Sequence, residues 1–215
     1  MAGEGPFRGS ALLWALALEA ARRDNGRLTA RSLRDIDAAG VAALFRIETE
    51  TVPDPERRAA LLRDVARRLE RDHRGEAQAL LDAAGSSLGG EDGLLELLAR
   101  YEAYSDPLRK KSYLFAKICE RRGWLSVSDP EHWEVCADNV LMRLALRSGL
   151  VAPGPLDEVR AATRAALKDV AERSGVPPPV LDDLLWELGR DDRDLLGTEG
   201  GDLREPPRDP DSAWY

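Results

Sequence analysis

Apolar residues recur at three- and four-residue spacing along almost the whole chain, and almost no segment alternates polar with apolar residues. The first pattern places apolar side chains on one face of an α-helix, whereas a half-buried strand needs the second. The segment "ERRAALLRDVARRLERD" at 56–72 shows the helical spacing plainly. The sequence therefore predicts an all-α fold.

Capping residues and prolines set the limits of the expected helices. Ser10 can cap the first helix, Thr29 or Ser32 the second, and Pro53 or Pro55 begins the third. The expected helices cover about 10–23, 29–39, 56–72, 92–103, 108–122, 139–148, 156–174 and 179–188.

A chain of 215 residues with 43% hydrophobic content can bury one sizeable core, so we expect one compact domain over 1–189, with two helical lobes. Within it, Ser128 and Glu131 have the spacing of a capping box. From Arg190 on, Gly, Pro and acidic residues replace the periodic pattern, which predicts an extended or partly disordered acidic tail over 190–215. The aromatic end of this tail, Trp214 and Tyr215, can dock back onto the domain.

Several classes of protein and site are disfavoured. The longest apolar run, 11–21, is interrupted by Glu19 and is too short to cross a bilayer, so we expect a cytoplasmic protein without a membrane partner. The chain has only two cysteines, Cys119 and Cys136, and two histidines, too few for a typical zinc or iron–sulfur site. We therefore expect no metal, no cofactor, and two reduced core thiols.

The net charge of −8 is unevenly distributed. Residues 182–215 hold 11 acids and 4 bases and so carry −7 of it, which leaves the rest of the chain nearly neutral. Basic stretches such as 109–111 and the pair Arg143 and Arg147 can therefore still meet phosphate groups. The alternative is that these charges only solvate an exposed face.

The segment "EVCADNVLMRLALRSGLV" at 134–151 places one aspartate, Asp138, at the start of an expected helix. Backbone N–H groups and the helix dipole stabilise a carboxylate there, so capping alone is a sufficient explanation. The pattern Asp138, Arg143, Arg147 and Gly-Leu-Val at 149–151 also resembles the segment that carries the catalytic aspartate in the helix-hairpin-helix DNA glycosylases. The glycine-rich hairpin that usually lies upstream in that superfamily is absent here.

Two related families share further residues with this chain. The segment 111–116, "KSYLFA", is similar to a segment of the archaeal 8-oxoguanine DNA glycosylases, which implies a nucleophilic lysine at Lys111 and a base-stacking ring at Phe115. The same family reads its base with an aspartate and a tryptophan four residues apart, as are Asp182 and Trp186 in "LDDLLW". For Lys111, a phosphate-contacting or merely solvated lysine is an equal alternative.

The queuosine salvage N-glycosylases resemble the chain over about 8–195. The similar segments are "LFRIETETVPDPERRAALLRDV" at 44–65, "CADNVLMRL" at 136–144 and "VLDDLLWELGRDDRD" at 180–194. Phe45 lies in the first of these, where it can provide a second stacking wall for a base.

The resemblances imply an all-α N-glycosylase with a cleft between its lobes. Breaking an N-glycosidic bond builds positive charge on C1′ of the sugar, and an ionised Asp138 beside that carbon would stabilise it. We expect a monomer that excises a modified base from DNA, including bulky or phage-type bases, with Arg143 among the substrate-binding residues. The rival hypotheses are a queuosine-type nucleoside or nucleotide N-glycosylase and a non-catalytic helical nucleic-acid-binding module.

Overall fold

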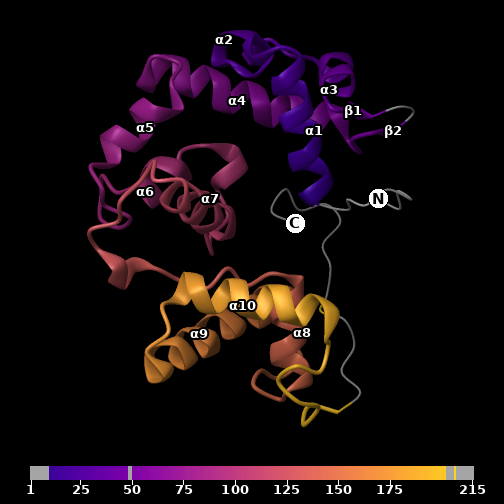
Figure 1. The fold of residues 1–215 in the computed structure, drawn as a ribbon, viewed down its shortest axis with the longest axis vertical. Helices are drawn as coiled ribbons and strands as arrows, with labels where there is room; N and C mark the ends of the chain where they lie inside the picture. The colour runs from indigo at the N-terminus through magenta and orange to yellow at the C-terminus, as the bar shows by residue number, and fades with distance from the viewer. Residues whose placement is uncertain (1–9, 48–49, 202–205, 207–215) are drawn as a thin grey trace. The chain divides into compact units, whose positions relative to one another are not determined.

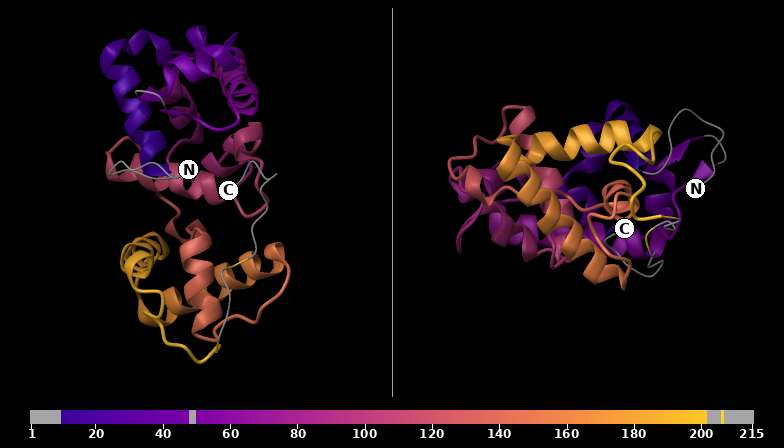
Figure 2. Two further views of the ribbon diagram at one scale, coloured as in Figure 1. Left: turned by 90° about the vertical axis from the view of Figure 1, so that its right-hand side faces the viewer. Right: turned by 90° about the horizontal axis from the view of Figure 1, so that it is seen from below.

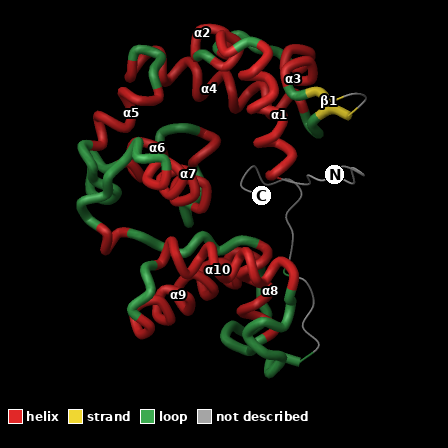
Figure 3. Tube along the Cα trace, viewed as in Figure 1, coloured by secondary structure: helices red, strands yellow, loops and turns green. Residues whose placement is uncertain are grey.

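The computed structural model describes residues 10–47, 50–201 and 206. Within these ranges the fold is all-α, as predicted, and its strands are one antiparallel pair of two residues each, β1 (Arg46–Ile47) and β2 (Glu50–Thr51) (Figures 1 and 3). No helix in these ranges combines the length and the apolar character that a membrane crossing needs.

The α-helices follow one another with short connections. Their bounds are α1 Ser10–Arg23, α2 Ala30–Leu33, α3 Ala38–Leu44, α4 Pro55–His73, α5 Ala77–Ala84, α6 Leu94–Ala99, α7 Lys110–Arg121, α8 Asn139–Arg147, α9 Leu156–Ser174 and α10 Pro178–Asp191. Three 3₁₀ turns lie at Asn25–Leu28, Glu102–Tyr104 and Pro130–His132.

The chain divides into two compact units, each with its own core. The N-terminal unit comprises 1–80 and 101–103, and the C-terminal unit comprises 81–100 and 104–215, each described within the ranges given above. Every residue proposed from the sequence for the candidate site lies in the C-terminal unit, except Phe45.

The N-terminal unit packs α1 and α3 around a core of Leu16, Val41, Val52 and Ala59. The single helix expected over 29–39 is wrong, because Asp37 caps a new helix by accepting the Gly40 N–H at 2.7 Å. Long side chains of α4 hold the turn between α2 and α3. Arg63 and Arg67 donate to the backbone carbonyls of Ile36 and Arg34 at 2.7 and 2.9 Å.

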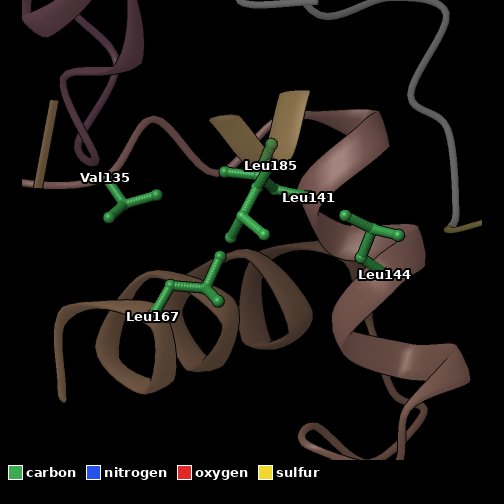
Figure 4. Close-up of a cluster of buried hydrophobic side chains, with 5 residues drawn as sticks. All are labelled: Val135, Leu141, Leu144, Leu167 and Leu185. Atoms are coloured by element: carbon green, nitrogen blue, oxygen red, sulfur yellow. The ribbon is translucent and has the colours of Figure 1, made fainter. Parts of the chain in front are cut away.

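Helices α8, α9 and α10 of the C-terminal unit pack against one another and bury apolar side chains between them (Figures 2 and 4). One cluster consists of Val135, Leu141, Leu144, Leu167 and Leu185 (Figure 4). A second lies between α8 and α9 and consists of Met142, Ala145, Leu146, Val151 and Val159. Leu141 and Leu144 are almost fully buried, so α8 is the central helix of this unit.

The predicted capping box at 128–133 is wrong. Ser128 donates its hydroxyl to the carbonyl of Ser86 at 3.1 Å, and the segment forms only the 3₁₀ turn Pro130–His132. The neighbouring Asp129 accepts the N–H groups of Leu88 and Gly89 at 2.7 and 2.9 Å. This carboxylate therefore joins the loop before α6 to the loop before α8.

The tail from Arg190, predicted to be extended or partly disordered, is not extended where the structure describes it. Helix α10 continues to Asp191, and turns follow up to residue 201. Asp194 pairs with Arg147, Leu195 packs on the core cluster of Figure 4, and the Gly200 N–H donates to the carbonyl of Arg147 at 2.9 Å. Trp214 and Tyr215 lie outside the described residues.

Candidate active site

Asp138 is the N-cap of α8, as the sequence predicted. Its backbone is extended (φ −104°, ψ −177°), and its Oδ1 accepts the N–H groups of Val140 and Leu141 at 2.9 and 3.0 Å. Among the described residues, no donor reaches Oδ2. The half-buried side chain is thus fixed through one of its two oxygens.

Asp182 of α10 is buried and lies beside the segment that leads to Asp138. Its Oδ1 accepts the Cys136 N–H at 3.0 Å, and its Oδ2 pairs directly with the ammonium group of Lys117 on α7. Lys117 also donates to Oδ1 of Asp183 at 2.8 Å, and Arg121 pairs with the same aspartate. Both oxygens predicted to read a base edge therefore serve protein groups in this structure.

Five charged or ionisable groups gather at this point, and we call them the Cys136 cluster: Lys110, Lys117, Cys136, Asp138 and Asp182. The pKa of the Cys136 thiol is raised first by burial and then by the two carboxylates, while the two ammonium groups oppose the rise. Burial also raises the pKa of Asp182; Lys117 and the Cys136 N–H counteract this, and the charge of Asp138 adds to it. Cys136 stays a neutral thiol under ordinary conditions, as expected for a core cysteine.

The lysines of α7 lie on different faces. Lys110 and Lys117 are seven residues apart, which is nearly two helical turns, so they share the face directed to Cys136. Lys111 is one residue further along, about 100° around the helix from Lys110. The assignment of a nucleophile to Lys111 stays a prediction, and the charge of Lys110 is among those that act on the Cys136 thiol.

The start of α7 is fixed by a buried ion pair. Asp106 accepts the N–H groups of Leu108 and Lys110 at 3.1 and 3.2 Å, and Arg160 of α9 donates to its Oδ2 at 2.7 Å. The side chains of Asp106 and Arg160 are 0% and 2% exposed, so removal of either would leave a buried charge without its partner.

The remaining predicted binding residues are spread over several elements. Arg143 donates to the carbonyl of Gly189 at 2.7 Å and so ties α8 to the end of α10. Phe115 stacks edge-on against Tyr104, with ring centroids 6.0 Å apart. Trp186 is 39% exposed, and the guanidinium of Arg190 lies 5.3 Å from its ring centroid.

Asp182 and Trp186 have the spacing of one helical face, but Asp182 is only 4% exposed and Trp186 is 39% exposed. Phe45 ends α3 and packs against the core of the N-terminal unit. The structure therefore brings together Asp138 and Asp182 from the predicted set, and it adds Lys110, Lys117 and Cys136.

Sequence reasoning missed Lys117, although the sequence carries a signal for it. The residue stands in "FAKIC", between buried Ala116 and buried Cys119, on the apolar side of its helix. A lysine in such a position is seldom buried without an acidic partner, so it predicts a buried aspartate or glutamate elsewhere in the chain.

Within the described residues, no group of three or more His, Cys, Asp or Glu side chains has the arrangement of a metal site. Cys119 and Cys136 are both buried free thiols. The charged groups of the Cys136 cluster are therefore the carboxylates of Asp138 and Asp182 and the ammonium groups of Lys110 and Lys117. Comparison with known proteins finds no family model that matches the chain and no curated protein with a similar sequence.

Proposed function

We propose that the protein is an N-glycosylase that removes a modified base from DNA, with Asp138 as its central catalytic residue. The observation that carries the proposal is the state of the Asp138 carboxylate. Two backbone N–H groups hold Oδ1, and no donor among the described residues takes Oδ2. A carboxylate held in this way can face a developing positive charge without reorganising.

The reaction begins as the bond from C1′ to the base nitrogen lengthens and the base takes the bonding electrons. Positive charge then develops on C1′ and the ring oxygen, and Oδ2 of Asp138 stabilises it. A water molecule adds to C1′ and gives up one proton, to Asp138 or to solvent, while the departing base takes one proton from solvent and leaves as a neutral species. The product is an intact abasic site.

Lys110 gives this centre a second charged group that can act on DNA. As an ammonium ion beside the Cys136 cluster, it suits a phosphate of the bound strand. As a free amine, it could instead attack C1′ and form a Schiff base that leads to strand cleavage. We favour the phosphate role, because Arg109 and Lys110 are adjacent in a basic run that suits a phosphate group.

The test is a released-base assay on the Asp138→Asn variant. Asparagine keeps the shape of the cap but removes its charge, so we expect near-normal folding and a loss of base release of about 10²-fold or more. The substrates are duplexes with normal, oxidised, deaminated and phage-type modified bases, and free modified nucleosides in parallel. Released bases are identified by mass spectrometry.

Asp37→Asn is the matched control, because Asp37 caps α3 in the same way but belongs to the N-terminal unit. Wild-type turnover in Asp138→Asn would exclude the proposed mechanism. Release from free nucleosides alone would favour the salvage reaction. If the wild-type protein released no base from any substrate, the non-catalytic binding module would remain.

A further inference from the structure

The Lys117–Asp182 pair joins three segments of the C-terminal unit. Lys117 comes from α7 and Asp182 from α10, and each side chain is only 6% exposed. The third segment is the extended chain at 133–138, which Asp182 contacts through the Cys136 N–H. A buried pair of this kind costs desolvation, so its presence is a weak argument for stability alone.

The chain at 133–138 is held at two points before it reaches Asp138. Lys168 of α9 donates to the carbonyl of Trp133 at 2.8 Å and to the carboxylate of Glu134 at 3.1 Å. Asp182 then accepts the Cys136 N–H, two residues before Asp138. The backbone that carries Asp138 is therefore attached to α9 and α10, whereas its side chain is attached to α8.

Asp183 is adjacent to Asp182 and shares its partner Lys117, but it differs in one respect. Among the described residues it forms ion pairs with Lys117 and Arg121, and its side chain is 31% exposed. Asp182 alone accepts a hydrogen bond from the chain that leads to Asp138. A change at Asp183 therefore tests the loss of a charge next to α7, whereas a change at Asp182 also removes the contact with the chain that leads to Asp138.

We infer that Asp182, kept in place by Lys117, is a positioning residue for Asp138 and not a reader of the base. By accepting the Cys136 N–H, it fixes the backbone two residues before Asp138 and so the position of the Asp138 carboxylate at the N-terminus of α8. This inference rests on the proposed N-glycosylase function for its meaning in catalysis, but the geometry that it describes can be measured without activity.

The kinetic experiment compares Asp182→Ala, Asp182→Asn and the matched control Asp183→Ala. Single-turnover base release and the dissociation constant for substrate DNA are measured separately for each. We expect Asp182→Ala to lower the release rate by about 10- to 100-fold, because a small displacement of a catalytic group has that effect, with affinity unchanged. Asp182→Asn should recover much of the rate, since its amide oxygen can accept the Cys136 N–H, and Asp183→Ala should stay close to wild type.

A second measurement does not depend on activity, so it also applies to poorly active variants and to an inactive wild type. Amide hydrogen exchange is followed at Val140 and Leu141, the two N–H groups that Asp138 accepts. We expect faster exchange at both amides in Asp182→Ala and unchanged exchange in Asp183→Ala, while thermal unfolding reports on the fold as a whole. If the wild type released no base, this exchange difference would still support the positioning role, although the proposed function had failed.

Two results would overturn the inference. Weaker substrate binding with an unchanged release rate in Asp182→Ala would make Asp182 a base-reading residue. Equal effects of Asp182→Ala and Asp183→Ala on rate and amide exchange would mean that the pair supports only the fold.

Discussion

Single aspartates join the loops of the C-terminal unit by accepting backbone N–H groups. Asp106 does so before α7, Asp129 between two loops, Asp138 at α8 and Asp182 at Cys136. An ionised carboxylate is a stronger acceptor than a neutral group, and each of these bonds depends on the charge. Acidification should therefore weaken the bonds that Asp129 accepts.

Asp129 provides the clearest pH dependence. Burial alone would raise its pKa, but the N–H groups of Leu88 and Gly89 lower it below the ordinary value of 3.8. A lowered pKa in the folded state means that Asp129 stabilises the fold above about pH 3.8 and that this contribution is lost as the pH falls through the folded-state pKa. We expect Asp129→Asn to lower the free energy of unfolding at pH 7 by about 1–3 kcal/mol.

The measurement is urea unfolding of both proteins from pH 7 to pH 3. The difference between them should narrow below about pH 3.8. Asp169→Asn is the control, because Asp169 is exposed and pairs only within its helix with Arg173. A difference that stayed constant down to pH 3 would contradict the role of the ionised Asp129.

The lysines of α7 give a second prediction at this scale. Lys110 shares a helical face with Lys117, and its charge acts on the Cys136 thiol, whereas Lys111 lies about 100° further around the helix. We expect Lys110→Gln to lower base release by about tenfold or more and Lys111→Gln to change it by less than about threefold. Borohydride should trap no covalent adduct. An adduct that vanished in Lys111→Gln but persisted in Lys110→Gln would restore the assignment made from sequence.

Part of the candidate site follows from local sequence and part does not. The cap position of Asp138 is a local property, since it depends on the residues that immediately follow, and the structure confirms it. The pairing of Lys117 with Asp182 spans 65 residues, and no spacing rule connects such partners. The i, i+4 rule placed Asp182 and Trp186 on one face but could not predict that one is buried and the other exposed.

At the scale of elements, helix ends were predictable wherever a local signal sets them. The helices at Ser10–Arg23 and Leu156–Ser174 agree with prediction at both ends. The turn at 34–37 was not predicted, because Arg63 and Arg67 of a later helix stabilise it. A separate α5 was not predicted either; it exists because Arg74 and Gly75 adopt left-handed conformations that end α4.

The crossing of α8 and α10 gives a prediction for elements. A Cβ at Gly189 would lie 2.5 Å from Cδ1 and 3.0 Å from Cγ of Leu144, which is buried in the core cluster of Figure 4. We expect Gly189→Val to lower the free energy of unfolding by about 1–3 kcal/mol through overpacking. Urea unfolding measures this, with the exposed neighbour change Glu187→Val as the control for β-branching. If Gly189→Val and Glu187→Val lowered the free energy of unfolding equally, α8 and α10 would be able to move apart without loss of stability.

At the scale of the whole molecule, the two units have separate cores, so damage to one core should remain local. Leu16→Ala in the N-terminal unit and Leu141→Ala in the C-terminal unit each remove a buried leucine. Each change should cost its own unit about 2–5 kcal/mol. We expect each variant to lose amide exchange protection mainly in the unit that carries the change.

Hydrogen exchange resolved by mass spectrometry distinguishes the two units. Peptides from 55–73 report on the N-terminal unit and peptides from 156–174 on the C-terminal unit. Equal loss of protection in both sets, for either variant, would mean that the chain opens as one cooperative structure.

The buried Asp106 also sets the rotational phase of α7. By accepting the N–H groups of Leu108 and Lys110, it fixes the residue at which the helix starts, and each residue added before that point turns the helix by about 100°. Deletion of one residue between Asp106 and Lys110 would therefore place Lys111 at the helical position that Lys110 now holds. In homologous chains, the length of this short link and not the number of lysines would decide which lysine shares the helical face of Lys117.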